Sequence, residues 1–163
     1  MLEATEMTLP ASAAVVPLAP RAMVAVSALR GQEAALRARL GLPGPAKRNE
    51  LALWNGPASW LVQEGDAEAL ALALAGQAAV SAQGDGLALL AVRGAGALDI
   101  LRQVVSIDVE RFGPDDVALT MAAHIGVRLW REGEGFVLAC YRSYAGALHQ
   151  ALMAAERNCR ARG

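Results

Sequence analysis

Short apolar runs that alternate with polar residues, or that end at turn-forming residues, recur along this chain and predict β-strands. Asn55-Gly56-Pro57 is typical of a turn between two of these runs. Gly84-Asp85-Gly86 predicts a tight hairpin, and the four residues from Glu132 to Gly135 predict another. The predicted strands are a short edge strand at Val24 and Val26, followed by 51–54, 59–63, 79–83, 87–93, 117–123, 127–131 and 136–141.

Other segments have apolar residues three and four positions apart, which is the helical period. Ser27, Asp66 and Ser143 are placed to cap three predicted helices, and Gly94–Gly96 opens a fourth at 97–105. Gly41 is placed to end the first of them. The last helix is expected to have one stripe of Tyr144, Leu148, Leu152 and Ala155, with Gln150, Glu156 and Arg157 outside.

The order of these elements defines the expected fold class. Strand pairs are joined by hairpins and separated by single helices, whereas a parallel, doubly wound sheet needs a helix between nearly every pair of strands. We therefore predict an α+β fold with antiparallel sheet and packed helices. Residues 1–21 contain Pro10, Pro17 and Pro20 and few charges, and we interpret them as an arm that is partly disordered or docks on a partner. Residues 22–163 are expected to form a single domain.

Composition narrows the classes of function. The 163 residues are 55% hydrophobic and 19% charged, with a net charge of −1, which excludes intrinsic disorder and argues against a nucleic-acid partner. No run approaches the roughly 20 apolar residues of a membrane span, and the first residues do not resemble a signal peptide. Two cysteines do not form a disulfide framework, so we expect a cytoplasmic protein. The apolar excess also hints at surface left for a partner.

Catalytic and metal-binding patterns are weak. His124 and His149 are expected on separate elements, as a strand-end and a solvent-facing helix residue, and neither has a Cys or His beside it. Cys140 is typical of a small core residue. Gly94-Ala95-Gly96 begins like a dinucleotide-binding motif, but Asp99 occupies the third glycine position, so a structural corner is favoured. We predict no catalytic, cofactor-binding or metal-binding residue in this chain.

Three residues are candidates for contact with a partner. Trp54 and Trp60 flank the Asn55-Gly56-Pro57 turn, and tryptophan is favoured as an anchor at interfaces, although a buried tryptophan core explains the pair equally well. Arg142 precedes Ser143 and is placed to bind an acidic group or to cap a neighbouring element.

Several motifs occur in an order that resembles the gamma subunit of heterotetrameric sarcosine oxidase. LWNGPASWLV at residues 53–62 is similar to a W-x-G-P-x-x-W-L segment, and residues 80–86 resemble a V-x-x-x-x-D-G hairpin. Residues 90–101 are similar to an L-x-V-x-G-x-x-A-x-x-x-L corner. The remaining matches are Ile107-Asp108-Val109 with Phe112, Arg142-Ser143-Tyr144-Ala145 and, more weakly, Leu29-Arg30-Gly31.

The resemblance implies a fold like the amino-terminal domain of the glycine-cleavage T-protein, in the folate-binding superfamily. It implies a four-subunit enzyme that oxidatively demethylates sarcosine, with FAD in the beta subunit and FMN between alpha and beta. NAD and tetrahydrofolate belong to alpha, and zinc to the small delta subunit. The gamma subunit contacts alpha and has no assigned catalytic residue, so the resemblance implies a structural and assembly role.

Departures from the family pattern leave the substrate open. Gly84 stands where a serine is common, Val105 where a cysteine is common, and Tyr141 where a proline is usual. Related heteromeric dehydrogenases of other N-methyl amino acids have similar gamma subunits. A stand-alone tetrahydrofolate-binding protein of the same superfamily is the alternative interpretation.

Overall fold

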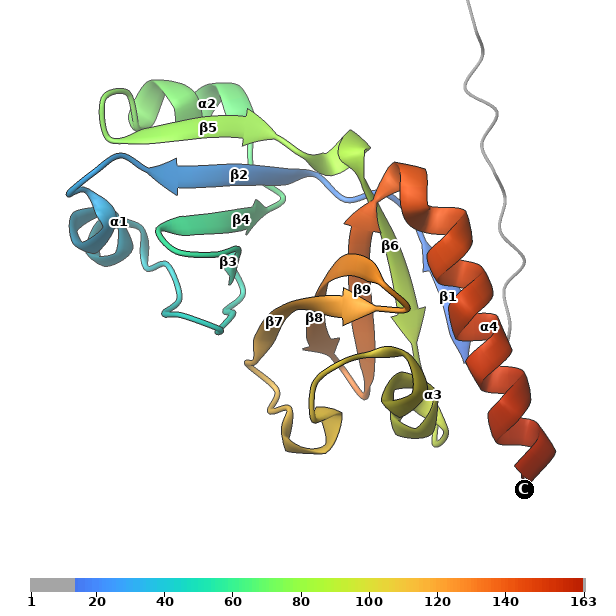
Figure 1. The fold of residues 1–163 in the computed structure, drawn as a ribbon. Coiled ribbons are helices and arrows are strands. Elements are labelled where there is room, and N and C mark those ends of the chain that lie inside the picture. Colours follow the sequence, from blue (N-terminus) through green and yellow to red (C-terminus); the bar gives the residue numbers. More distant parts are fainter. Residues whose placement is uncertain (1–13, 163) are drawn as a thin grey trace, which may run out of the picture.

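The computed structural model describes residues 14–162, which form two antiparallel sheets with helices packed on them (Figure 1). The predicted α+β class is confirmed. The first sheet has five strands, in the spatial order β1 (Val15–Leu18), β6 (Leu87–Val92), β9 (Gly135–Tyr141), β8 (Ile125–Glu132) and β7 (Val117–Ala122). The second has four, in the order β3 (Ala52–Trp54), β4 (Ser59–Gln63), β2 (Met23–Ala28) and β5 (Ala78–Ala82).

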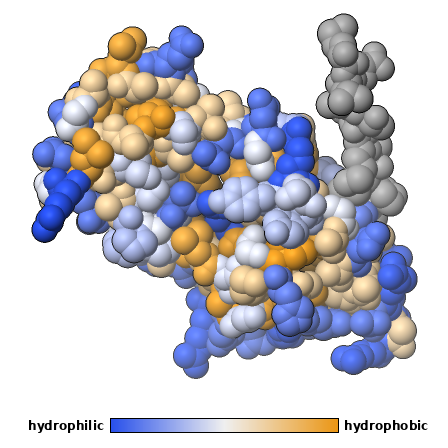
Figure 2. Space-filling view, turned by 45° about the horizontal axis from the view of Figure 1, so that its top comes forward, coloured by the Kyte–Doolittle hydropathy of each residue, from blue (hydrophilic) through white to orange (hydrophobic). Residues whose placement is uncertain are grey.

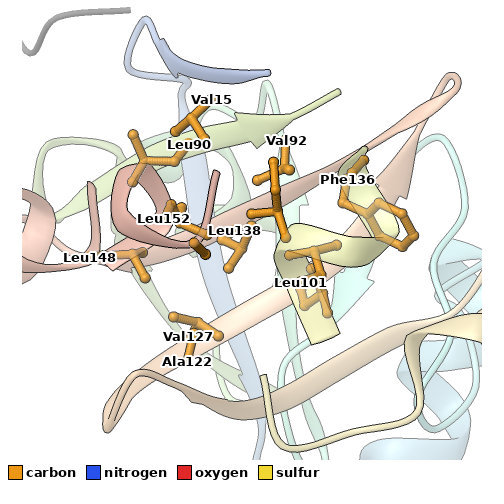
Figure 3. Close-up of a cluster of buried hydrophobic side chains, with 14 of the residues drawn as sticks. Val15, Leu90, Val92, Leu101, Ala122, Val127, Phe136, Leu138, Leu148 and Leu152 are labelled. Atoms are coloured by element: carbon orange, nitrogen blue, oxygen red, sulfur yellow. The ribbon is translucent and has the colours of Figure 1, made fainter. Parts of the chain in front are cut away.

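One face of the five-stranded sheet is covered by α3 (Ala97–Val104) and α4 (Ala145–Arg162). Figure 3 shows Leu90 and Leu138 of this sheet in the same apolar cluster as Leu148 and Leu152 of α4. These four side chains are buried. Burying large aliphatic side chains contributes about 1.5–3 kcal/mol each, so this cluster is the principal core of the described residues.

The four-stranded sheet has its own helices, α1 (Glu33–Leu40) and α2 (Ala67–Ala73). Val24, Val26 and Trp60 face these helices and form a second cluster with Leu36. Residues of the opposite parity face the five-stranded sheet, and they form the cluster that joins the two sheets. That cluster consists of Met23, Leu53 and Leu61 from one sheet with Leu87, Leu89, Val117, Trp130, Val137 and Ala139 from the other.

The predicted hairpin at Gly84–Gly86 is wrong. This segment is a 3-10 helix that carries the chain from β5, which pairs with β2, to β6, which pairs with β1 and β9. A Cβ built on Gly84 would lie 2.6 Å from the carbonyl oxygen of Arg21, so only glycine fits where this link passes the β1–β2 link. Glycine therefore indicates a close crossing of two links here and not a reversal of the chain.

The predicted arm also needs correction. Residues 15–18 of the segment assigned to it form β1, which pairs with β6, and Val15 is fully buried. Pro17 suits this position because β1 is an edge strand, where a missing N–H does not break a ladder. The rest of the predicted arm, residues 1–13, lies outside the described residues.

Helix boundaries follow the predicted caps only in part. Asp66 accepts bonds from the backbone N–H groups of Glu68 and Ala69, and Gly41 ends α1 with a left-handed conformation, as predicted. Ser27 instead lies inside β2, a central strand and not an edge strand. Ser143 lies in a 3-10 turn before α4 and makes no capping bond there. Serine is favoured at caps but does not require one, and the β2 pairing outweighs that preference at Ser27.

Within α4, the predicted stripe is correct at three of its apolar positions, Leu148, Leu152 and Ala155, which are buried. Tyr144 is exposed and lies before the helix. His149 and Glu156 are buried, although both were expected to face solvent. The packed face of α4 is wider than one stripe because the helix lies against β1, β6 and β9 and also against α3.

Candidate functional site

The predicted contact residues do not form one site. Trp60 is 1% exposed, and its indole Nε1–H donates to the carbonyl oxygen of Pro43 at 2.9 Å, so it belongs to the core and is not a surface contact. Trp54 is half-buried opposite Trp60 in the β3–β4 pair. Arg142 is exposed in the 3-10 turn before α4, next to Tyr141.

A different surface has the character of a contact site. We call it the β7–β9 patch, and it consists of Leu119, Met121, Gly126, Arg128 and Tyr141. Leu119, Met121 and Tyr141 are 43%, 45% and 53% exposed. These side chains share one sheet face, since Leu119 pairs with Arg128 and Met121 pairs with Gly126 across β7 and β8.

The patch is the uncovered continuation of the face that packs on the four-stranded sheet. Val117 and Trp130, two residues from Leu119 and Arg128 along β7 and β8, pair with each other, and Trp130 also pairs with Val137 of β9. All three are buried against that sheet. Alternate residues of β7, at 117, 119 and 121, are its large apolar side chains, so the sequence predicts that this face of the strand is apolar. The sequence pattern does not indicate where the cover stops, so it does not single out Leu119 or Met121.

Arg128 is oriented on the patch by two contacts. Its Cζ lies 5.7 Å from the centre of the Tyr141 ring, and its Nε–H donates to the Asn55 side-chain oxygen at 2.5 Å. Asn55 comes from the β3–β4 turn of the other sheet, whose Gly56 lies close to the Leu119 side chain. The turn between Trp54 and Trp60 thus contributes to this patch through Asn55, whereas Trp60 itself does not take part.

A second depression, of about 530 Å³, is lined by charged residues where the β1–β2 link meets β8. Arg21 donates two bonds to the Glu132 carboxylate, at 2.7 and 2.8 Å. The bond from Arg21 lowers the pKa of Glu132, against the opposing effect of burial, and the Trp130 indole N–H adds a bond at 3.2 Å. Because this carboxylate is ionised and already paired, it is suited to holding the link in place and not to acid–base chemistry.

The remaining candidate residues lie in surroundings that favour a structural role over a catalytic one. Burial raises the pKa of the Cys140 thiol, which keeps it protonated and unreactive in the core. Gly94–Gly96 lies between β6 and α3 and is the predicted strand-to-helix corner, and Asp99 pairs with Arg102 one turn along α3. Across residues 14–162, no three His, Cys, Asp or Glu side chains are grouped as metal ligands. In that same range, no helix has the length and apolar character needed to cross a bilayer.

The outer surface is not uniformly apolar. In Figure 2, apolar residues occupy separate areas with hydrophilic residues between them. Outside the patch, the exposed large apolar residues among those described are Leu29, Leu51, Leu72 and Tyr144, and Leu72 of α2 is the most exposed at 82%. Scattered exposed apolar residues are normal, whereas several aligned on one sheet face mark an interaction surface.

Comparison with solved structures places the fold. A chain of the heterotetrameric sarcosine oxidase from Corynebacterium sp. U-96 superposes with a TM-score of 0.76 at 23% identity, covering 88% of this chain and 83% of that one. The regulatory subunit of aspartate kinase from Thermus thermophilus gives a TM-score of 0.48 at 15% identity, covering 88% and 96%. Neither a protein-family model nor a curated protein matches the sequence.

The class that the fold defines is therefore an α+β module with two antiparallel sheets, shared with a chain of heterotetrameric sarcosine oxidase. The resemblance predicted from the sequence motifs is confirmed at the level of the fold.

Proposed function

We propose that this chain is the gamma subunit of a heteromeric, sarcosine-oxidase-type flavoenzyme, with a structural and assembly role and no active site of its own. The observation that supports this most directly is the shared fold with a chain of heterotetrameric sarcosine oxidase over 88% of this chain. The ordered motifs between residues 53 and 145 agree with it.

The surface chemistry also favours this role. The exposed apolar residues of the β7–β9 patch suit a contact with protein, while the charged depression has its central carboxylate paired with Arg21. The direct partner in this proposal is the alpha subunit, with beta and delta in the same complex. FAD, FMN, NAD, tetrahydrofolate and zinc would belong to those subunits, and none to this chain.

Affinity purification of the full-length tagged chain from its source cells tests the proposal. We expect larger subunits to be recovered with it, flavin absorbance in the complex, and sarcosine-dependent oxidation by that complex. The tagged chain produced alone is the control, and we expect it to be colourless and inactive.

Two results would contradict the proposal. The first is sarcosine oxidation by the purified chain alone. The second is tetrahydrofolate binding by the isolated chain in calorimetry together with no recovered partner, which would support the stand-alone folate-binding alternative.

If the complex is recovered, its oxidation rates with sarcosine and with other N-methyl amino acids identify its substrate.

A further inference from the structure

We propose that the β7–β9 patch is the surface that docks on the larger partner, and that its occupant is a partner segment with apolar side chains and a carboxylate. This inference rests on the proposed function, because it assigns the face and the chemistry of the contact that the proposed function requires.

The apolar part of the patch has the shape of an anchor site. Leu119, Met121 and Tyr141 line a shallow depression of about 370 Å³, and Gly126 lies between Met121 and the β9 strand. A Cβ built on Gly126 would meet no atom within 4 Å, so the space above this glycine is open. An apolar side chain inserted there would contact an aromatic ring and two flexible aliphatic chains, as anchors at interfaces commonly do.

Arg128 adds a specific polar group to this apolar floor. Asn55 and the Tyr141 ring fix its orientation, while its two terminal nitrogens bond to no other group in residues 14–162. A guanidinium that is already oriented loses little entropy when it binds, and its two terminal nitrogens match the two oxygens of a carboxylate. The preferred ligand of Arg128 is therefore an aspartate, a glutamate or a terminal carboxylate.

The charge on the patch agrees with a carboxylate ligand. β7, β9 and residues 125–131 of β8 contain no aspartate or glutamate, and Glu132, which ends β8 at the covered end of this face, is paired with Arg21. Exposed Arg142 follows Tyr141, and His124 lies in the turn between β7 and β8. Exposed Asp85 and Asp108 are two residues from Leu87 and Ser106, which pair with Tyr141 and bond to Met121, so the border of the patch has mixed charge. The cation on the patch itself is Arg128. Charge complementarity with Arg128 therefore favours a carboxylate on the partner segment.

A second copy of this chain fits the patch less well. Two copies joined by a two-fold axis would present the same surface to each other. Arg128 of one copy would then lie near Arg128 of the other, with no carboxylate in either patch to separate them. Like charges brought together at an interface oppose association, so the patch is suited to a different chain.

Variants of the full-length tagged chain test the assignment when each is co-purified with its flavin-bearing partners. Met121→Asp places a carboxylate on the anchor site, and Arg128→Glu reverses the charge. We expect each to lower the flavin recovered per tagged chain by about tenfold or more. The matched control, Leu72→Asp, introduces the same carboxylate on exposed α2 and is expected to leave recovery unchanged. Melting temperatures of the three purified variants separate lost docking from lost folding.

The outcomes distinguish this inference from the proposed function. If the wild-type chain recovers no flavoprotein, both are contradicted. If the wild type recovers it, and both patch variants do so as well as the Leu72 control, the docking face is wrong while the proposed function stands.

Hydroxyl-radical footprinting tests when the patch is covered, because Met121 and Tyr141 carry oxidisable side chains. We expect both to be oxidised in the free full-length chain and protected in the complex. Protection in the free monomer would mean that another part of this chain covers the patch, and protection that rises with chain concentration would mean a second copy. Either result overturns the proposal.

Discussion

The two faces of the five-stranded sheet differ in how completely they are covered. On one face, α3 and α4 cover the strands, and Leu138 and Val127 lie in one continuous cluster. On the other face, the four-stranded sheet covers Trp130 and its β7 partner Val117. Leu119 and Met121, which follow Val117 on the same face of β7, are exposed. The same strands thus supply core at one end and an open apolar surface at the other. An apolar residue in a strand is consistent with either environment.

The largest expected effect comes from the covered end of the second face. Trp130→Ala removes a fully buried indole that packs between the sheets, and we expect it to lower the free energy of unfolding by about 3–5 kcal/mol. Leu119→Ala on the same face is the control, with an expected loss of about 0.5 kcal/mol or less because the side chain is exposed. Urea denaturation of both variants measures the difference. Similar losses in the two would show that the patch is part of the core.

An intermediate effect is expected where the two sheets are joined. Gly84→Ala places a Cβ against the backbone oxygen of Arg21, and backbone cannot move aside as a flexible side chain can. We expect a loss of about 1–3 kcal/mol, typical of overpacking. Gly126→Ala is the matched control, because a Cβ there meets open space. Thermal unfolding of the pair checks this, and equal melting temperatures would show that the links are not in close contact.

The smallest expected effect concerns the Arg21–Glu132 pair beside Trp130. Glu132→Gln removes the charge, and because both side chains are partly exposed we expect a loss of only about 1 kcal/mol at pH 7. The pKa of Glu132 is lowered in the folded protein, below its usual value of 4.5. The stabilisation is therefore present above pH 4.5 and is lost as the pH falls through the folded-state pKa.

Urea denaturation of wild type and Glu132→Gln between pH 7 and pH 3 measures this dependence. The difference between the two proteins is expected to be constant down to about pH 5 and then to shrink. A difference that grows with acidity would mean that Glu132 is protonated in the folded state.

Local chemistry in the sequence predicted many of the individual elements. The Asn55-Gly56-Pro57 turn, the Asp66 cap and the hairpin at Glu132–Gly135 are all present, because each depends on residues close together in the chain. The candidate contact site was predicted much less well. Trp60 is a core residue, whereas Leu119, Met121 and Arg128 gain their significance only from their neighbours in space.

The α+β class, the position of most strands and helices, and the family resemblance could all be predicted from the amino-acid sequence, since they follow from periodicity, turn residues and ordered motifs. Three features became evident only in the folded chain: β5 and β6 lie in different sheets, β1 completes one of those sheets, and His149 is buried. The reason is that pairing and burial depend on which segments meet across long stretches of chain. A glycine-rich link or an apolar strand face has the same local chemistry whichever segment lies against it.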